Sequence, residues 1–384
     1  TQPHHVSSAA SDVYKRQLVE LEANHFLLEL FHGPTLAFKD FAMQLIGQLF
    51  QVVLKRCRKR VTIIGATSGD TGSAAIEAFK GLDSVNTFIL FPDGRVSDVQ
   101  RRQMTTAKED NVHAIAVNGT FDDCQSRVKD MFNDHKFRSE VQLAGINSIN
   151  WARVLAQVVY YFSSAISLGA PSRKVSFTVP TGNFGDVFAG YIAKEMGLSI
   201  DRLVVATNQN DILHRCLSGN GYHTTEVASS ISPSMDIQIS SNFERALFFA
   251  YRQDANKISK LMEQLKQNNG FDISSDALDA LSKHYSSGMA TEVETSDTIK
   301  CMLTSSGQLL CPHTAIGVKV AKELRDNEVP MVTLATAHPA KFPAAVKKAS
   351  KATPELPGRM SDLFERSEQT LKVDNNLVQL KNLI

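Results

Sequence analysis

Apolar positions recur along this chain with two spacings, and the two spacings alternate. Short apolar runs typical of buried strands occupy residues 61–64, 87–91, 112–117, 175–179, 203–206 and 331–334. Between them, apolar positions three and four residues apart predict helices over 73–79, 97–107, 121–132, 149–167 and 187–196. Strands that alternate with helices favour parallel sheets covered by helices on both faces. In such sheets, ligands gather at the loops that follow the carboxyl ends of the strands.

The clearest helical pattern begins directly after Lys39. One apolar face, expected to be buried, is formed by Ala42, Leu45, Ile46, Leu49, Phe50 and Val53. The turn at residues 32–34 delivers Lys39 to the start of this helix. Phe38 and Phe41 flank the lysine and partly remove it from water, which favours the neutral amine needed for Schiff-base chemistry. Taken alone, these residues leave a surface lysine beside a helix start as the alternative.

The two ends of the chain and the stretch 208–300 show weaker patterns. Helices are predicted over 243–252, 255–266 and 275–285, and residues 363–384 form an amphipathic tail expected to pack on the surface. Residues 1–17 are polar and lack apolar periodicity, so we expect them to be disordered and not part of the native fold. They have neither the apolar centre of a signal peptide nor the arginine-rich character of a transit peptide.

Composition narrows the classes of function. The 384 residues are 43% hydrophobic and 21% charged, as in ordinary globular proteins, with a net charge of +1. Near-zero charge gives no electrostatic reason to expect nucleic acid or an anionic membrane as a partner. No apolar run approaches the roughly 20 residues of a membrane span. The five cysteines are scattered and suggest neither disulfides nor a zinc site, so we expect no metal and a reducing, cytoplasmic location.

Two glycine-bearing loops follow predicted strands and open helices. The first, at residues 65–72, is not a Walker A loop, because Asp70 and Thr71 stand where that motif requires glycine and lysine. The second spans residues 180–186, with Gly182 and Gly185. Glycines at a helix start let backbone N–H groups bind an anion. The pattern alone leaves an anion site and an ordinary turn both open.

Two further segments contain polar side chains near predicted strand or helix ends. In residues 147–153, Ser148 and Asn150 can cap the following helix, whereas Arg153 falls in its first turn, where the helix dipole disfavours a cation. That placement suggests an anionic partner for Arg153. In residues 335–342, Thr336 and Lys341 follow the strand predicted at 331–334.

The sequence from His32 to Asp40, His-Gly-Pro-Thr-Leu-Ala-Phe-Lys-Asp, resembles the lysine signature of the threonine synthase family. These enzymes use pyridoxal phosphate and belong to the tryptophan-synthase-β-like group. The resemblance extends over residues 20–350 through four motifs in family order, but the family's N-terminal region has no counterpart here. It implies an α/β fold of two domains with mainly parallel sheets covered by helices, and the cofactor in the cleft between them (PLP fold type II). We expect these domains at 18–155 and 156–384.

The resemblance also implies a role for each motif. Lys39 would form the Schiff base with pyridoxal phosphate and act as the catalytic group. The cofactor's phosphate would be held by Gly182, Asn183, Phe184 and Gly185, and its pyridine nitrogen by Thr336. Substrate would be bound by Ser68, Gly69, Asp70, Thr71, Asn147, Ser148, Arg153 and Lys341. Cys311 departs from the family, which usually has aspartate there.

The reaction implied is conversion of O-phosphohomoserine and water to threonine and phosphate, a step of threonine biosynthesis catalysed by a lyase. Alternatives are a pyridoxal-phosphate-dependent phospholyase, a serine or threonine dehydratase, and a catalytically inert protein of the same family that acts through interactions. The expected partner is a small phosphorylated amino acid, with neither nucleic acid nor membrane, and the protein would be a monomer or homodimer.

Overall fold

The computed structural model describes residues 17–384, which form two compact units. The first unit comprises Gly33–Arg153 and Glu355–Ile384, and the second comprises the described residues up to His32 together with Val154–Pro354. These bounds differ at both chain ends from the domains expected at 18–155 and 156–384. The reason is strand pairing across long sequence distances. Strand β2 (His25–Glu29) pairs with β12 (Met331–Ala335), and β13 (Leu371–Asp374) pairs with β5 (Val112–Asn118). The expectation for residues 1–17 lies outside the described residues except for Gln17, which begins β1.

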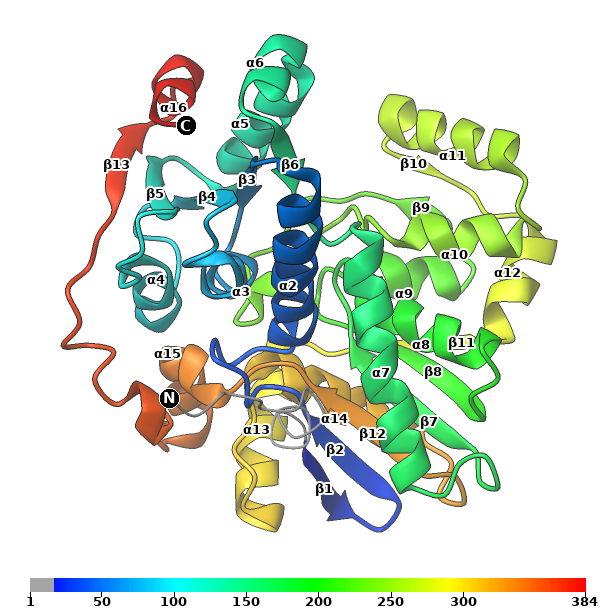
Figure 1. The fold of residues 1–384 in the computed structure, drawn as a ribbon. Coiled ribbons are helices and arrows are strands. Elements are labelled where there is room, and N and C mark those ends of the chain that lie inside the picture. Colours follow the sequence, from blue (N-terminus) through cyan, green and yellow to red (C-terminus); the bar gives the residue numbers. More distant parts are fainter. Residues whose placement is uncertain (1–16) are drawn as a thin grey trace. The chain divides into compact units, whose positions relative to one another are not determined.

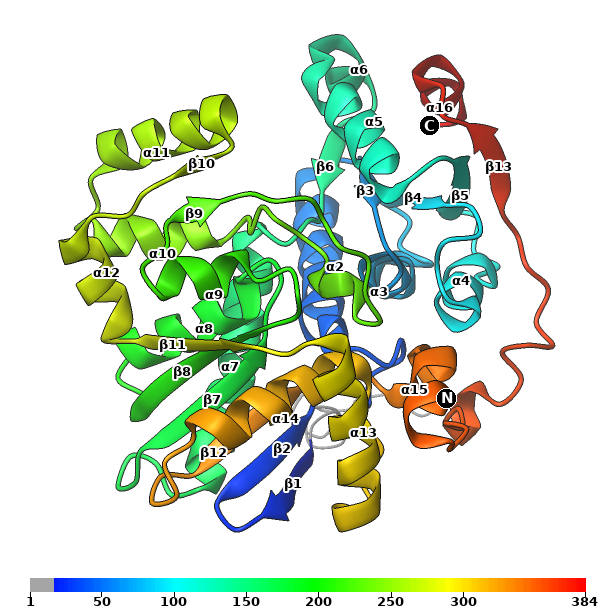
Figure 2. The same ribbon diagram turned by 180° about the vertical axis from the view of Figure 1, so that it is seen from behind.

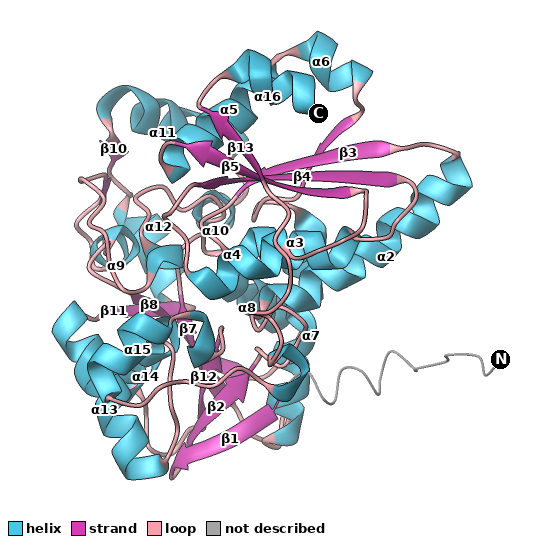
Figure 3. Cartoon of the chain, turned by 90° about the vertical axis from the view of Figure 1, so that its left-hand side faces the viewer, coloured by secondary structure: helices cyan, strands magenta, loops and turns pink. Residues whose placement is uncertain are grey.

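A five-stranded sheet forms the centre of the first unit, in the order β13-β5-β4-β3-β6 (Figure 3). All neighbouring strands run parallel. The strands are β3 (Val61–Ala66), β4 (Val85–Pro92), β5 (Val112–Asn118), β6 (Leu143–Gly145) and β13 (Leu371–Asp374). The apolar runs correctly predict β3, β4 and β5. The strand β6 has only three residues, and β13 alternates apolar residues with Lys372 and Asp374, so neither produces such a run.

Helices cover both faces of this sheet, as the sequence predicts. Ile63 and Ile89 pack in a cluster with α2, α3 and α4, whereas Ile64 and Phe88 pack with α5 and α16 on the opposite face. Consecutive residues of one strand therefore face opposite sides of the sheet and pack against different helices. The helical segments of this unit are α2 (Lys39–Cys57), α3 (Asp70–Phe79), α4 (Asp98–Thr105), α5 (Phe121–Asn133), α6 (His135–Glu140), η3 (Gly358–Met360) and α16 (Leu377–Leu383).

The buried face of α2 differs from the face expected from its sequence pattern. Leu45, Leu49 and Val53 are about half exposed, at 46%, 46% and 53%. Ala42 and Ile46 are buried as expected, together with Asp40, Met43, Gly47 and Leu54. A Cβ at Gly47 would lie 2.4 Å from the carbonyl oxygen of Ala78, so α2 rests on α3 through a glycine. Periodicity alone does not show such a contact, because glycine contributes no apolar signal.

The second unit is built on a six-stranded sheet in the order β1-β2-β12-β7-β8-β11 (Figure 1). Only β1 is antiparallel to its neighbour. The strands are β1 (Gln17–Glu22), β2 (His25–Glu29), β7 (Val175–Pro180), β8 (Ile200–Thr207), β11 (Tyr285–Met289) and β12 (Met331–Ala335), with a separate pair β9 (Tyr222–His223) and β10 (Gly270–Phe271). The helix expected over 275–285 ends at Ser282, and Tyr285 begins a strand.

Helix α14 is the most deeply buried helix of the second unit, because it contacts β7, β8, β11 and β12 (Figure 2). A Cβ at Gly317 would lie 2.9 Å from the Thr333 methyl group, so glycine allows α14 to approach the sheet closely. The helical segments of this unit are α7 (Trp151–Ser167, whose first turn belongs to the first unit), α8 (Gly185–Glu195), α9 (Ile212–Leu217), η1 (Pro233–Met235), α10 (Phe243–Ala250), α11 (Ala255–Asn268), α12 (Ser275–Ser282), α13 (Glu292–Ser306), α14 (Pro312–Leu324), η2 (Pro339–Lys341) and α15 (Pro343–Ser350).

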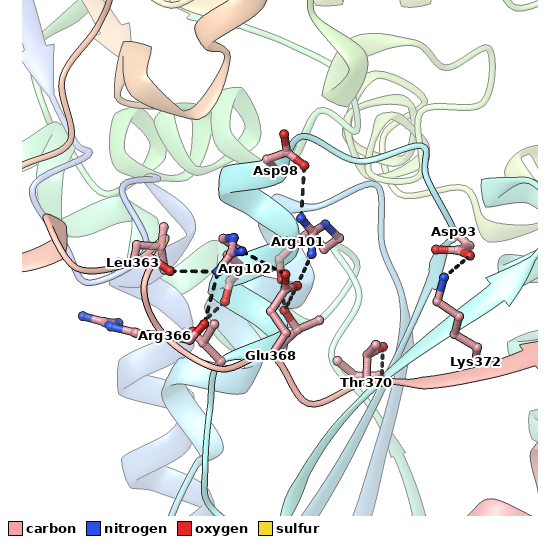
Figure 4. Close-up of polar contacts among 12 residues, drawn as sticks. Asp93, Asp98, Arg101, Arg102, Leu363, Arg366, Glu368, Thr370 and Lys372 are labelled. Atoms are coloured by element: carbon pink, nitrogen blue, oxygen red, sulfur yellow. Dashed lines mark hydrogen bonds and ion pairs between the residues drawn. The ribbon is translucent and has the colours of Figure 1, made fainter.

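The C-terminal tail is attached to the first unit by charge as well as by strand pairing. Figure 4 shows Glu368 beside Arg101 and Arg102 of α4, with ion pairs to both. The Thr105 hydroxyl also donates to Glu368, at 2.7 Å. The expectation of a surface-packed tail is therefore incomplete, because β13 extends the central sheet. Within residues 17–384, no helix is long and apolar enough to cross a bilayer.

Candidate functional site

The turn before α2 fixes the position of Lys39. The Asp40 carboxylate accepts hydrogen bonds from the Thr35 amide at 2.8 Å and the Thr35 hydroxyl at 2.6 Å. A Cβ at Gly33 would lie 2.4 Å from the same carboxylate, which requires glycine at that position. Asp40 is 2% exposed. Residues on both sides of the lysine therefore serve to hold the start of α2 in one conformation.

The Lys39 ammonium lies 3.6 Å from a carboxylate oxygen of Asp70, and its side chain is only 12% exposed. Gln100 donates from its side-chain amide to the other Asp70 oxygen at 2.8 Å, which fixes that carboxylate. Burial favours a neutral amine, as the sequence predicts, but a neighbouring carboxylate favours the ammonium. Asp70 is thus placed to influence which protonation state of Lys39 is favoured.

The loop that follows β3 is held by Thr67, a residue that the sequence did not single out. Its hydroxyl oxygen accepts from the amides of Gly69 and Gly72, both at 2.9 Å. Gly69 has a φ of +135°, and a Cβ there would meet the Gln100 amide group at 2.4 Å. Ser68 and Thr71 are half-buried on the same loop. These contacts hold the loop in one conformation at the start of α3.

Residues 147–153 follow the strand next to β3. Since Ile64 pairs with Gly145, this segment begins at the same edge of the sheet as the loop after β3. Asn150 caps α7, accepting from the Ala152 amide at 3.0 Å. Arg153 is 5% exposed and donates to the Ile146 carbonyl at 3.1 Å. A guanidinium carries five donors in a planar fork, an arrangement that suits phosphate or carboxylate.

We call this part of the first unit the lysine edge. It comprises Lys39, the loop 67–72 and the segment 147–153. The structure brings together Lys39 and Asp70, and it places the exposed Asn147, half-buried Ser148 and buried Arg153 after the neighbouring strand.

The loop after β7 in the second unit is fixed mainly through its backbone. The Gly182 carbonyl accepts from the Ser240 hydroxyl at 2.8 Å, and the Asn183 carbonyl accepts from the Asn242 amides at 3.0 and 3.1 Å. A Cβ at Gly182 would lie 2.7 Å from the Ser234 carbonyl oxygen, so the two backbones touch. Phe184 has a φ of +61° and precedes the first turn of α8.

This geometry fits a bound phosphate. The first N–H groups of a helix have no carbonyl partner within the helix, and the dipole favours a negative charge there. The loop from Gly182 to Gly185 is rigid, short in side chains and placed at such a helix start. Side chains that would block close approach to the backbone are absent at both glycines.

Thr336 lies near this loop at the same edge of the sheet. Thr333 of β12 pairs with Thr178 of β7, so the register brings Thr336 level with Thr181. Thr336 is 6% exposed, and Lys341, five residues further along, is fully buried. An ammonium is costly to bury unless acceptors or anions surround it. We call Gly182–Gly185, Thr336 and Lys341 the glycine-loop edge.

Asp186 is a buried acid at this edge that the sequence did not reveal. The hydroxyls of Tyr160 and Tyr161 both donate to its Oδ1, whereas Oδ2 has no hydrogen-bond partner among residues 17–384. Burial raises the pKa of Asp186 to about 6, against the lowering effect of the two tyrosine hydrogen bonds. The Tyr-Tyr pair of α7 looks like part of an apolar face, so only the folded chain shows this role.

Cys311, which departs from the family pattern, is the N-cap of α14. Its sulfur accepts from the Thr314 amide at 3.5 Å, which is the usual function of aspartate at that position. The substitution therefore preserves a cap. His338 similarly caps η2 by accepting from the Ala340 amide at 3.2 Å.

The chain is similar in sequence to known proteins over most of its length. The family described as pyridoxal-phosphate dependent enzyme matches residues 15–335, and the threonine synthase C-terminal family matches residues 314–384. The threonine synthase of Pseudomonas aeruginosa is 52% identical over 369 residues, covering 96% of this chain and 79% of that protein. The Saccharomyces cerevisiae threonine synthase is 46% identical over 354 residues, covering 85% of this chain and 69% of that protein.

A solved threonine synthase structure has a fold similar to that of this chain. PLP-bound threonine synthase from Brucella melitensis has a TM-score of 0.94 and 57% identity, covering 96% of this chain and 79% of that one. These relatives match 85–96% of the chain and confirm PLP fold type II. The chain is a pyridoxal-phosphate-dependent enzyme and belongs to the threonine synthase family.

Proposed function

We propose that this enzyme converts O-phosphohomoserine and water to threonine and inorganic phosphate. The observation that supports this most strongly is the lysine edge, where a fixed, ion-paired lysine belongs to the same sheet edge as a buried arginine. In the net reaction, the bond between the γ carbon and the phosphate oxygen breaks, and the γ carbon becomes a methyl group. The oxygen of water forms a new bond to the β carbon.

We assign the cofactor to residues of both edges. Pyridoxal phosphate, when bound, supplies an electron sink for negative charge that develops on substrate carbons. Lys39 holds it covalently, and the loop Gly182–Gly185, including Asn183 and Phe184, binds its phosphate. Thr336 provides a neutral hydroxyl to the pyridine nitrogen, which leaves that nitrogen unprotonated.

Lys39 is the proton carrier of the reaction in this proposal. Its amine takes the proton from the α carbon of the substrate and helps to move a β proton, which permits loss of the γ phosphate. Its ammonium returns a proton to the γ carbon, which becomes a methyl group. Asp70, 3.6 Å from the nitrogen, stabilises the ammonium, and Gln100 keeps Asp70 in place. With Asp70 and Gln100 held in place, Lys39 can gain and lose a proton without a change in the position of its side chain.

Substrate recognition is divided between two segments of the lysine edge. Arg153, with Asn147 and Ser148, binds the substrate's phosphate, since a planar guanidinium pairs with phosphate through two hydrogen bonds. Ser68 and Thr71, with the backbone of Gly69 and Asp70, bind the substrate's carboxylate at the start of α3. Lys341 contributes a buried positive charge for phosphate from the glycine-loop edge.

Product analysis tests this proposal. Purified enzyme loaded with pyridoxal phosphate is incubated with O-phosphohomoserine, and phosphate and threonine are measured together. We expect equal amounts of both. A phospholyase would release phosphate with an oxo acid and ammonia in place of threonine, and a dehydratase would consume serine or threonine instead. Release of no phosphate would favour an inert protein of the family.

We further propose a cytoplasmic location. The support is that Cys57, Cys124, Cys216, Cys301 and Cys311 are all free thiols, which is usual in a reducing compartment.

A further inference from the structure

Residues 240–243, which lead into α10, contact the loop after β7 one residue after another. The Ser240 hydroxyl donates to the Gly182 carbonyl at 2.8 Å. The backbone and side-chain amides of Asn242 both donate to the Asn183 carbonyl, at 3.1 and 3.0 Å. We call residues 240–243 the clamp. The clamp therefore occupies the carbonyl groups of the loop and leaves the loop's amide groups for another partner.

Ser241 fixes the side chain of the same loop residue. Its hydroxyl donates to Oδ1 of Asn183 at 3.1 Å. Asn183 is half-buried, and its side-chain nitrogen forms no hydrogen bond to residues 17–384. Because the oxygen of this amide group is held by Ser241, the nitrogen is the end that can donate to an anion.

Phe243 continues the series of contacts. Its ring centroid lies 5.2 Å from that of Phe184, in an edge-to-face arrangement. Phe184 has a φ of +61°, a backbone conformation that costs energy for a residue with a side chain. Such a conformation persists only where the surrounding structure holds it. The clamp therefore supports a loop residue whose backbone would otherwise relax.

Asn242 lies at the N-cap position of α10 but does not cap that helix. Asparagine at an N-cap usually accepts from an amide of the first helical turn, and the Asn242 side chain forms no such bond. Its nitrogen donates to Asn183, and its oxygen accepts from Nε of Arg245 at 3.2 Å. Asn242 is also fully buried. Its side chain thus holds the loop after β7 in place of its own helix.

We propose that Asn242 and Ser241 are positioning residues for the cofactor, and that both act through Asn183 to keep the loop in the conformation that binds the phosphate of pyridoxal phosphate. This inference rests on the phosphate-binding role proposed above for the loop. A loop that is already fixed binds an anion more tightly than a mobile one, because less conformational freedom is lost on binding.

The test compares pyridoxal phosphate with pyridoxal, which lacks the phosphate group, by absorbance titration of the cofactor-free full chain. Asn242→Ser keeps a good N-cap residue that is too short to reach the Asn183 carbonyl, and Ser241→Ala removes one hydroxyl. We expect pyridoxal phosphate to bind about fivefold more weakly to Asn242→Ser and about threefold more weakly to Ser241→Ala. The affinity for pyridoxal should stay unchanged in both variants.

Two controls accompany these variants. Asn376→Ser makes the same substitution at the N-cap of α16 in the other unit, and it should change neither affinity. Ser241→Ala is also combined with Asn183→Ala. If Ser241 acts through the Asn183 side chain, the double variant should bind pyridoxal phosphate as Asn183→Ala alone does. Circular dichroism establishes that each variant is folded.

Three results would overturn the inference. They are equal weakening of both ligands in Asn242→Ser, unchanged affinity for pyridoxal phosphate in both single variants, and a further loss from Ser241→Ala when Asn183 is already alanine. A wild type that binds the two ligands equally would refute the phosphate-binding role of the loop and the inference with it. No substrate is present in these titrations, so they are independent of the product analysis that tests the reaction.

Discussion

The lysine edge and the glycine-loop edge hold their polar groups by different means. At the lysine edge, side chains fix side chains, as in the chain of contacts from Lys39 through Asp70 to Gln100. At the glycine-loop edge, most contacts fix the backbone, and Gly182 touches another backbone segment directly. The first arrangement suits groups that exchange protons or bind substrate charges. The second suits an anion that remains in place.

This contrast leads to different sensitivities. Substitution of a charged side chain at the lysine edge should reduce turnover or substrate binding and leave the fold intact. Substitution at the glycine-loop edge should change cofactor affinity or stability, because shape and burial determine what that edge does.

The largest effect should come from Lys39→Ala. The variant lacks the amine proposed to hold the cofactor and move the proton, so turnover should fall about a thousandfold or more. Steady-state kinetics and the visible spectrum of the purified protein measure both roles. Lys55→Ala, an exposed lysine on the same helix, is the matched control and should retain full activity. Substantial turnover in Lys39→Ala would remove the lysine from the mechanism.

Arg153→Leu should be next in size. Removing the partner of a bound phosphate costs about 2–4 kcal/mol, or roughly 30- to 1000-fold in kcat/KM for O-phosphohomoserine. Cofactor affinity should change little, and Arg153→Lys should recover part of the loss. Arg138→Leu removes an exposed guanidinium of the same unit as a control. Equal losses for substrate and cofactor would show that Arg153 serves only the fold, through its bond to the Ile146 carbonyl.

Asp186 makes a pH-dependent prediction for the glycine-loop edge. Its folded pKa of about 6 lies above the ordinary aspartate value of 3.8, so the folded state binds the extra proton between these values. Relative to Asp186→Asn, the wild-type free energy of unfolding should therefore decrease by about 2 kcal/mol from pH 4 to pH 7. Denaturant titrations of the cofactor-free proteins measure the difference, with the exposed Asp279→Asn as control. Parallel pH profiles for wild type and Asp186→Asn would contradict the prediction.

Gly182→Ala should have the smallest effect. The added Cβ would lie 2.7 Å from the Ser234 carbonyl oxygen, which forces the two backbones apart. We expect a loss of about 1–3 kcal/mol in cofactor affinity, measured by absorbance titration, with substrate KM unchanged once cofactor is saturating. Gly358→Ala, where a Cβ meets open space, is the control. Unaltered cofactor affinity in Gly182→Ala would argue against a phosphate at this loop.

Sequence reasoning performed best where a residue's role depends on its neighbours in the chain. The helix from Lys39, the helix starts at both glycine loops and most of the parallel strands follow from local patterns. The lysine signature also led to the correct family, because it joins a glycine turn, a helix start and a reactive amine in nine residues.

Contacts across long sequence distances could not be predicted in this way. The partner of Lys39 depends on Asp70, thirty-one residues away, and the burial of Asp186 depends on Tyr160 and Tyr161. The buried face of α2 shifted because Gly47 provides a close contact with no apolar signal. The tail strand β13 depends on pairing with β5, more than two hundred residues earlier.

The most direct test of the account is to locate the cofactor's covalent attachment. The enzyme is loaded with pyridoxal phosphate and reduced with borohydride, then digested and sequenced by mass spectrometry. The account predicts a single pyridoxyl-modified peptide, modified at Lys39, and none in the Lys39→Ala variant. Modification at Lys341 or at any other lysine would contradict the assignment of the lysine edge.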